Sequence, residues 1–410
     1  MNVLIIGGGA SGMIAAISAA SNGANVTIYE HNSILGKKIL ATGNGKCNIS
    51  NRDFRLDCYN STDIDKLNNY FTQFDVEDTI SSFRSLGLML KEKNGYLYPA
   101  CEQAVVVRDI LKTGLEGYEV NVVTDVTVKS VKKITGGFSV ESNLGTNIFN
   151  RVIMACGSYA GLRKMERIPS DIDGYSLCYH LGHSVIPVKP ALTQVVCRED
   201  YFKEISGVRV ECLINLGCNG TYLGSEYGEM QITEFGVSGI PVFQLSRHIA
   251  ANPDNEYELV IDLMPGVSEE EFITMMQSRI LAYQGASVED FFLGILNTKL
   301  NALFIKLAGL DPMDVIGDGT EDAIIEAVSR IKCWKLNVKG TKSFENAQCC
   351  SGGIPLSEID DNCESKVTPG LYICGEMLDV DGKCGGYNLQ WAWTTGYIAG
   401  NAAGKEPAYD

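Results

Sequence analysis

The sequence predicts an α/β fold whose first domain is interrupted by a β segment and then by a helical segment. Three observations lead to this prediction. An apolar run at residues 3–6 meets a glycine-rich turn and an apolar helix. Residues 195–263 favour strands, whereas residues 268–332 favour helices. Small, turn-rich motifs then return from residue 352 to the end of the chain.

The first thirty residues have the order strand, glycine turn, helix, strand and acid. Gly7 permits a tight turn, Gly9 lets phosphates approach the backbone, and Gly12 lets the helix pack on the strand. A second strand at residues 25–29 ends at Glu30, close to the spacing at which an acid accepts a hydrogen bond from a ribose. This order predicts a site for an adenine dinucleotide, and these residues fit NAD and FAD equally.

The remainder of the first domain, to about residue 190, continues to alternate strand and helix signals. Valine-rich runs at residues 119–123 and 125–131, a glycine turn at residues 136–137 and a run at residues 138–141 predict a small β-meander. Residues 151–157 indicate a buried parallel strand that ends in a turn of small residues.

The interruption is predicted from strands at residues 194–197, 208–216 and 257–263, followed by helices. Ser268 and Glu271 form a predicted capping box, and a further helix begins at Thr320. We expect a nucleotide domain at residues 1–190 and 345–410, a β domain at 191–265 and 333–344, and a helical domain at 266–332. Three domains in series are the alternative, but the last of about sixty residues would have a marginal core.

Composition narrows the function classes. A net charge of −16 over 410 residues disfavours nucleic acid as a partner. The first apolar run belongs to the nucleotide fold, so we expect no leader, no membrane span and a cytoplasmic location. The fourteen cysteines show neither CxxC pairs nor zinc-like spacing, which indicates free thiols and no metal centre. His180 and His183 lack a third ligand and are interpreted as structural.

The last forty residues distinguish FAD from NAD. A strand closes on Gly375 and Glu376, and a glycine pair at residues 385–386 opens a final helix. A carboxylate there can accept hydrogen bonds from ribitol, and a helix N-terminus stabilises the negative charge that develops on a reduced flavin ring. An ordinary C-terminal helix after a glycine turn is the alternative. Because this C-terminal motif occurs together with an N-terminal nucleotide fold, the sequence favours FAD.

Residues 36–51, 228–239 and 375–390 resemble the BaiN/YhiN-type flavoproteins, also called the aminoacetone-oxidase-like FAD-binding family. The resemblance spans the chain. It implies a Rossmann-like FAD domain of the glutathione-reductase type, with an inserted barrel-like β domain and an inserted helical domain. Lys46 stands where members often carry arginine, and residues 348–353 depart from a more usual threonine–alanine run.

Carried onto this sequence, the resemblance implies a set of residues around a non-covalent FAD. The pyrophosphate residues are Gly7, Gly9, Ala10, Ser11 and Gly12, the adenosine ribose residues are Glu30 and His31, and the loop against the flavin comprises Lys37, Lys38, Thr42, Gly43, Gly45, Cys47 and Asn48. Val126 is expected to meet the adenine through its backbone, and Ala155, Cys156 and Gly157 to form the turn beneath the nucleotide. Gly375, Glu376, Gly386, Asn388 and Leu389 are expected at the ribitol and the ring.

The expected activity is that of an FAD-dependent oxidoreductase that transfers hydride between flavin N5 and a small organic or steroid-like substrate. No second glycine fingerprint follows a strand, so NAD(P)H is expected only as a transient reductant. Within the family, reduction of a conjugated enone and oxidation of a small amine are both open. A flavin-binding regulator without turnover and a tRNA-modifying flavoenzyme are the rivals from other classes, the latter disfavoured by the negative charge.

Tyr387 is the first candidate for a catalytic acid or base because it stands at the start of the helix that is expected to face the ring. The competing interpretation is a packed aromatic side chain. Cys47 lacks a neighbouring histidine, so a buried thiol is favoured over a nucleophile. Trp391 and Trp393 are expected in the core. Nothing in the sequence indicates the oligomeric state.

Overall fold

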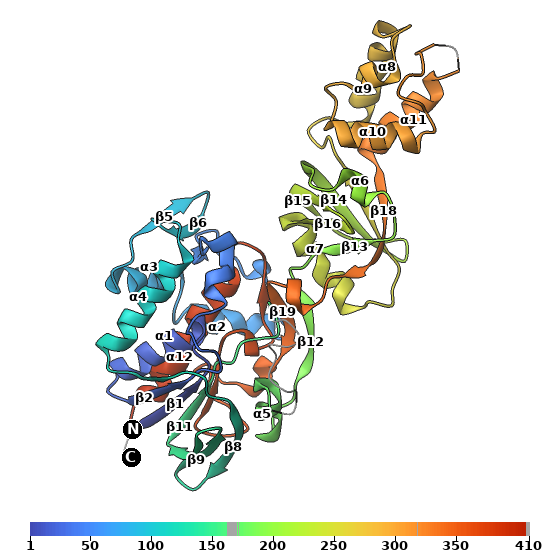
Figure 1. The fold of residues 1–410 in the computed structure, drawn as a ribbon. Helices are drawn as coiled ribbons and strands as arrows, with labels where there is room; N and C mark the ends of the chain where they lie inside the picture. The colour runs from blue at the N-terminus through green and yellow to red at the C-terminus, as the bar shows by residue number, and fades with distance from the viewer. Residues whose placement is uncertain (162–169, 171, 318, 407–410) are drawn as a thin grey trace. The chain divides into compact units, whose positions relative to one another are not determined.

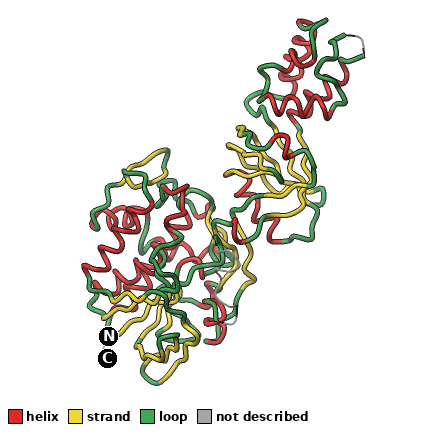
Figure 2. Tube along the Cα trace, in the orientation of Figure 1, coloured by secondary structure: helices red, strands yellow, loops and turns green. Residues whose placement is uncertain are grey.

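The computed structural model describes residues 1–161, 170, 172–317 and 319–406 (Figure 1). The chain divides into two compact units. Unit 1 comprises Met1–Lys189 and Cys349–Asp410, and unit 2 comprises Pro190–Gln348. Figure 2 shows helices and strands mixed along unit 1, whereas in unit 2 strands gather in one part and helices in another.

Unit 1 is built on a five-stranded parallel sheet. Its strands, in spatial order, are β20 (Leu371–Ile373), β11 (Arg151–Met154), β1 (Asn2–Ile6), β2 (Asn25–Tyr29) and β7 (Asn121–Val123). Ile6 of β1 pairs with Met154 on one side and with Tyr29 on the other. The central strand is buried along nearly its whole length, which explains its uninterrupted apolar sequence.

The predicted meander exists, but its first strand was assigned wrongly. The meander consists of β8 (Val128–Ile134), β9 (Gly137–Ser142) and β10 (Gly145–Phe149). The run at residues 119–123 instead supplies β7, which pairs in parallel with β2. The helix α4 (Ala104–Gly117) precedes it, so β7 completes a crossover onto the main sheet. A valine-rich run predicts a strand but does not identify the strand's partner.

Helices α1 (Ala10–Ser21) and α12 (Tyr387–Gly404) lie side by side in unit 1 (Figure 1). Three glycines of α12, spaced four residues apart, face three small residues of α1 with the same spacing. A Cβ atom at these glycines would lie 2.2–2.5 Å from a carbonyl oxygen of α1; the pairs are Gly396 with Ser11, Gly400 with Ala15 and Gly404 with Ala19. The C-terminal helix therefore packs with its backbone directly against the helix of the first glycine turn.

The remaining elements of unit 1 are short. They are η1 (Ile39–Gly45), β3 (Ser50–Asn51), η2 (Leu56–Cys58), β4 (Tyr59–Asn60), η3 (Ile64–Lys66), α2 (Leu67–Phe71), α3 (Val76–Ser85), β5 (Leu90–Lys93), β6 (Tyr96–Pro99), α5 (Gly174–His180), β19 (Cys349–Gly353), η6 (Leu356–Glu358), η7 (Gly375–Met377) and β21 (Asp381–Gly382), with η marking a 3-10 helix. The strand β12 (Ile186–Ala191) contains the boundary between the units.

Unit 2 contains a closed six-stranded barrel. Its strands, in spatial order, are β13 (Val195–Cys197), β16 (Gly236–Gly239), β15 (Thr221–Thr233), β14 (Arg209–Cys218), β17 (Tyr257–Asp262) and β18 (Trp334–Thr341). The strands predicted at residues 194–197, 208–216 and 257–263 correspond to β13, β14 and β17. The long β15 was not predicted, because its exposed half is polar and glycine-containing rather than strictly alternating.

The helices of unit 2 are α6 (Phe202–Ile205), α7 (Ile240–Ala251), α8 (Glu269–Ala282), α9 (Val288–Phe292), α10 (Thr298–Leu307) and α11 (Glu321–Lys332), and η5 (Phe344–Asn346) follows the barrel. The capping box of Ser268 and Glu271 at α8 is present. Barrel and helices share one apolar core, to which Ile214 and Leu336 contribute from strands and Phe304 and Ile331 from helices. The predicted boundary at residues 265–266 stays a prediction. In the described part of the chain, no helix has the length and apolar character needed to cross a bilayer.

Candidate cofactor site

The first glycine turn is held by contacts that exclude larger side chains. Gly7 has a φ of +107°, and a Cβ atom there would lie 2.3 Å from the carbonyl oxygen of Ala155. A Cβ atom at Gly12 would lie 2.0 Å from the carbonyl oxygen of Gly7. Gly9, by contrast, has no atom within 4 Å of the corresponding position. The turn therefore packs tightly against neighbouring backbone at Gly7 and Gly12, whereas there is open space beside Gly9.

The open side coincides with the N-terminus of α1. Gly9 is the N-cap, so the N–H groups of Ala10, Ser11 and Gly12 lie in the first turn, where a helix supplies no acceptor. These donors and the positive end of the helix dipole favour an anion such as a pyrophosphate.

Glu30 is a fixed acceptor at the end of β2. It is 7% exposed, and its Oε2 accepts a hydrogen bond from the Gly8 N–H at 2.7 Å. Its Oε1 accepts from the backbone and side-chain N–H groups of Asn32, each at 2.7 Å. A carboxylate has about four lone-pair positions, so Glu30 keeps capacity for a further donor such as a ribose hydroxyl.

Two other residues predicted at the adenosine end lie beside Glu30. His31 Nδ1 lies 3.1 Å from Thr127 Oγ1. The backbone N–H of Val126 donates to the carbonyl of Glu30 at 2.9 Å. This hydrogen bond uses the N–H of Val126, and the predicted contact of its backbone with an adenine stays a prediction.

The loop at residues 36–48 contains several left-handed backbone conformations. The φ angle is positive at Gly43, Asn44, Gly45 and Cys47. The turn is closed by the Cys47 N–H donating to the carbonyl of Thr42 at 3.2 Å. A left-handed backbone conformation costs free energy at a non-glycine residue such as Asn44 or Cys47, and such strain is concentrated at functional sites.

Asn48 supplies the strongest indication that this loop takes a ligand. Its Oδ1 is buried and has no hydrogen-bond partner among the described residues. An unsatisfied buried acceptor costs about 1–3 kcal/mol. An FAD carries a ring N–H and ribitol hydroxyls, either of which can supply the missing donor, so Asn48 fits the predicted cofactor.

Cys47 has the properties of a structural thiol. It is fully buried, and burial raises its pKa to about 11. The thiol therefore stays protonated near neutral pH, which favours the interpretation as a buried side chain over that as a nucleophile.

The C-terminal half of the predicted site packs closely against the start of α1. Gly375 has a φ of +69°, and a Cβ atom there would lie 2.5 Å from Ser11 Oγ. The Gly375 carbonyl accepts from Trp391 Nε1 at 3.2 Å, and its N–H donates to Thr395 Oγ1 at 2.9 Å. The turn after β20 is therefore held between the first glycine turn and α12, which brings the two halves of the site together.

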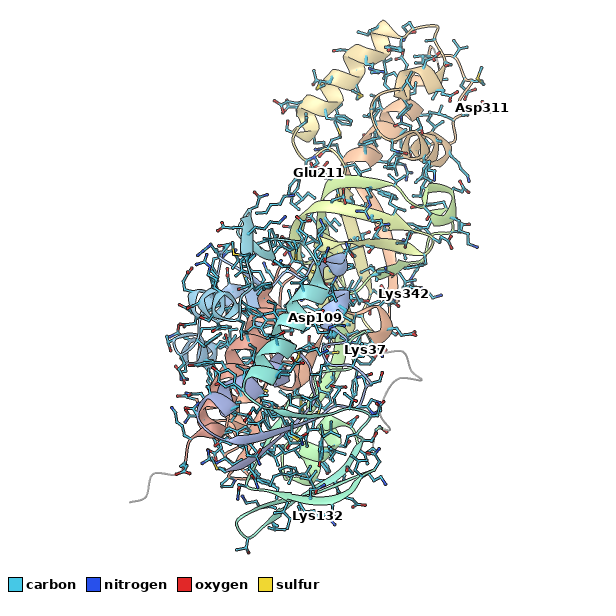
Figure 3. All side chains as sticks on the ribbon, turned by 60° about the vertical axis from the view of Figure 1, so that its left-hand side comes forward. Lys37, Asp109, Lys132, Glu211, Asp311 and Lys342 are labelled. Atoms are coloured by element: carbon cyan, nitrogen blue, oxygen red, sulfur yellow. The ribbon has the colours of Figure 1, made fainter. Side chains whose placement is uncertain are left out.

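Glu376 joins three segments that are distant in sequence. Its Oε2 accepts from Lys38 Nζ at 2.6 Å and from Ser158 Oγ at 2.7 Å. Lys38 belongs to the loop at residues 36–48, and Ser158 follows the turn at residues 155–157. Lys37 instead contacts Asn32, with Nζ 3.3 Å from Oδ1, and Figure 3 labels its position on the loop.

The turn at residues 155–157 lies against the first glycine turn, and its predicted position beneath the nucleotide stays a prediction. The Ala155 N–H donates to the carbonyl of Ile6 at 2.9 Å. Burial raises the pKa of the Cys156 thiol to about 12. Gly157 has a φ of +72° and open space where a Cβ atom would be.

The start of α12 is shaped by close backbone contacts. Gly386 has a φ of +95°, and a Cβ atom there would lie 2.7 Å from the backbone of Ser50. Asn388 donates to and accepts from the backbone of Gly382, each at 2.8 Å. Its side chain thus shapes the loop before the helix, while Leu389 is partly buried beside it.

Tyr387 is anchored within the protein. Its hydroxyl donates to the carbonyl of Asp53 at 2.8 Å, and its ring meets Tyr59 edge-on with centroids 5.7 Å apart. Burial raises the pKa of Tyr387 further above its usual value. These contacts match the packed-aromatic interpretation more closely than that of a catalytic acid.

The sequence analysis did not identify Gln390 and Ser158 as residues that hold the segments around the predicted site. Gln390 is buried, its Oε1 accepts from Ser50 Oγ at 2.6 Å, and its Nε2 lies 2.9 Å from Thr79 Oγ1. An amide flanked by apolar residues in a buried helix was the available signal. Nothing local to Ser158 marks it, because its role depends on Glu376.

His180 and His183 were considered as metal ligands, and the contacts of His183 fit the structural interpretation. His183 is buried, with Nδ1 2.7 Å from Glu358 and Nε2 2.8 Å from Ser365. Within the described residues, no group of three or more His, Cys, Asp or Glu side chains could hold a metal ion.

The chain is similar to known proteins over nearly its whole length. The family described as "HI0933-like protein Rossmann domain" matches residues 1–402. The chain is 38% identical over 411 residues to a 3-dehydro-bile acid delta(4,6)-reductase from Clostridium scindens, covering 98% of this chain and 99% of that protein. It is 28% identical over 403 residues to a ribosomal RNA dihydrouridine synthase from Haemophilus influenzae, covering 96% of each.

Among solved structures, the Sdh1 complex of Mycobacterium smegmatis in the apo form aligns with a TM-score of 0.50 and 15% identity. The alignment covers 98% of this chain and 68% of that chain. At this level of identity the similarity concerns the fold alone.

Proposed function

The chain belongs to the HI0933-like Rossmann-domain family and is an FAD-dependent oxidoreductase, and we propose that it reduces a carbon–carbon double bond conjugated to a ketone. The substrate is a small organic or steroid-like molecule, and NAD(P)H is the reductant. The observation that carries the proposal is the close approach of Gly375 to Ser11 at the start of α1, because it places the predicted flavin end beside the dinucleotide turn.

The protein's part in this chemistry is binding, orientation and charge stabilisation. When bound, FAD supplies hydride transfer at its N5. The first turn of α1 would hold the pyrophosphate, Glu30 would accept from the ribose, and Glu376, whose carboxylate is oriented by Lys38 and Ser158, would accept from the ribitol. The N-terminus of α12 supplies a positive dipole for charge that develops on the ring.

The two named relatives share a reaction type that supports the choice of a double bond as the target. A delta(4,6)-reductase and a dihydrouridine synthase both add hydrogen to a carbon–carbon double bond. The higher identity to the bile-acid enzyme favours a small lipophilic substrate over RNA. The net charge of −16 also opposes association with a polyanion.

The proposal is tested by anaerobic half-reactions of the purified holoprotein. We expect NADH or NADPH to bleach the flavin absorbance, and one equivalent of a 3-oxo-4,6-diene steroid to restore it. The matched steroid without these double bonds should leave the flavin reduced.

Three results would contradict the proposal. Re-oxidation by unmodified ribosomal RNA and not by the dienone would favour the RNA-modifying rival. Reduction of the oxidised flavin by a small amine would favour an amine oxidase. A flavin that none of these compounds reduces or oxidises would favour a regulator without turnover.

A further inference from the structure

Unit 2 contains a cavity of about 270 Å³ where the barrel meets the helices. Glu199 and Tyr201 line it from the segment after β13, Leu307 from the end of α10, Arg330 from α11, and Trp334 and Lys335 from the start of β18. None of these residues belongs to the predicted cofactor site, which lies in unit 1. This volume lies just below the usual range for ligand pockets of about 300–1,000 Å³, so it suits a small metabolite rather than a dinucleotide or steroid.

Two buried polar atoms without partners belong to residues that line this cavity. Among the described residues, the buried side-chain atoms that lack a hydrogen bond are Asn48 Oδ1, Thr193 Oγ1, Glu199 Oε2, Gln244 Oε1 and Arg330 Nε. Glu199 Oε2 requires a donor, whereas Arg330 Nε requires an acceptor. A buried donor or acceptor that lacks a hydrogen bond costs about 1–3 kcal/mol, and a charged group costs more. A ligand with both functions would satisfy both atoms.

Each of these two side chains makes hydrogen bonds through another of its atoms. Glu199 Oε1 accepts from the N–H of Asn337 at 2.7 Å and from its amide at 3.1 Å. Arg330 Nη2 donates to Glu326 Oε1 at 2.7 Å. These contacts leave Glu199 Oε2 and Arg330 Nε for a ligand.

Tyr201 and Trp334 form an aromatic wall with an additional donor. Their rings are nearly parallel, with centroids 6.5 Å apart and an interplanar angle of 28°. Trp334 Nε1 donates to the Tyr201 hydroxyl oxygen at 3.2 Å, so the hydroxyl proton is directed elsewhere. Burial raises the pKa of Tyr201 to about 12, which keeps that proton in place near neutral pH.

Besides the thiol of Cys333, the lining offers one anionic acceptor, two cations, a hydroxyl donor and an apolar wall. We propose that this cavity binds a small amino carboxylate, an α-amino acid in its zwitterionic form. The carboxylate accepts from Arg330 and Tyr201 near Lys335, and the ammonium group donates to Glu199 Oε2. A small side chain packs on Leu307 and Trp334. This assignment does not depend on the substrate proposed for the flavin.

Isothermal titration of the full-length holoprotein with glycine, L-alanine and L-leucine tests the proposal. We expect saturable binding of at least one of them, and no comparable binding of propionate or propylamine, each of which carries only one of the two charges. Glu199→Gln and Arg330→Met should each weaken the binding at least tenfold. Arg209→Met is the matched control, because Arg209 pairs with Glu229 on the barrel at a site that does not line the cavity.

Absence of binding by all three amino acids to the wild-type protein would overturn the proposal, as would equal binding of propionate or propylamine. Unchanged affinity in both charge variants would overturn it as well. If either charge variant fails to fold, Tyr201→Phe, which keeps the ring, replaces it with the expectation of a weaker but measurable affinity.

Discussion

Glu30, Glu376 and Asn48 are the acceptor side chains around the predicted cofactor site, and they differ in how far the protein already satisfies them. Both carboxylates are oriented by several donors and keep spare capacity. Asn48 Oδ1 has no partner among the described residues. This distribution is typical of a site that is pre-organised for a ligand rich in hydroxyl and N–H groups.

At Tyr387 the structure supports a structural role that a single substitution can test. Tyr387→Phe removes the hydrogen bond to Asp53 but keeps the ring against Tyr59. We expect a loss of about 1 kcal/mol in the free energy of unfolding, and a kcat for the dienone within about threefold of the wild type. Loss of a general acid would instead cost about 10²–10⁴-fold in kcat, with an altered pH profile, and would contradict this role.

Glu102 makes a pH-dependent contribution to the stability of the fold, next to Lys46 of the loop at residues 36–48. It pairs with Lys91 and, at 2.9 Å, with Lys46, and these hydrogen bonds lower its pKa to about 2. A carboxylate with a lowered pKa stabilises the folded state above its unfolded pKa of about 4.3, and this contribution is lost as the pH falls toward 2.

Thermal melting of Glu102→Gln tests this contribution. We expect a lower Tm than that of the wild type from pH 7 to pH 5, and a difference that shrinks below pH 4 and in high salt. Glu116→Gln, at an exposed position near the end of α4, is the control and should leave the Tm unchanged. A difference between Glu102→Gln and wild type that is independent of pH would contradict the ion-pair interpretation.

Among the secondary-structure elements, the packing of α12 on α1 connects the two ends of the chain. The glycines of α12 allow the two backbones to approach closely, and Trp391 and Thr395 of the same helix hold Gly375. The position of the flavin end relative to the pyrophosphate turn therefore depends on the distance between these two helices.

Gly400→Ala tests this dependence. We expect the substitution to destabilise the protein, although helix propensity alone would make it stabilising. Alanine is normally favoured over glycine inside a helix by about 1 kcal/mol. Here its Cβ would lie 2.2 Å from the carbonyl oxygen of Ala15, and overpacking costs about 1–3 kcal/mol. We expect a lower Tm and weaker retention of FAD. Gly117→Ala is the matched control, since no atom lies within 4 Å of its Cβ position, and it should be neutral or stabilising.

Local patterns predicted the elements whose signals lie close together in sequence. The unit β1–α1–β2 and the glycine start of α12 follow from short motifs with a direct steric cause, as the contacts of Gly7, Gly12 and Gly386 show. The sheet that β7 joins, the pairing of Asn388 with Gly382 and the partner of Ser158 depend on residues distant in sequence. No local pattern specifies such contacts, so the structure was needed to identify them.

At the scale of the whole molecule, each unit has its own apolar core. In unit 2 that core is common to barrel and helices, and Phe304 of α10 contacts Trp334 of β18 edge-on with centroids 5.7 Å apart. Figure 3 labels Asp311, which follows α10, and Lys342, which follows β18; they mark the helical and barrel parts of this unit. The shared core indicates that barrel and helices unfold together.

Phe304→Ala tests this cooperativity by hydrogen exchange. Removing the buried ring should destabilise unit 2 by about 3–5 kcal/mol and accelerate exchange in the helices and in β14, β17 and β18 alike. Leu281→Ala is the control, because Leu281 is 74% exposed on α8. Faster exchange confined to the helices would contradict a common core and would support a separate helical domain at residues 266–332.

The central claim is that the first glycine turn and the start of α12 form one non-covalent FAD site. Its most direct test is the flavin content of the purified protein after reconstitution, measured by absorbance and by mass spectrometry of the cofactor released on denaturation. We predict one FAD per chain, released intact. A chain that binds no flavin after reconstitution, or that binds FMN in place of FAD, would contradict the account.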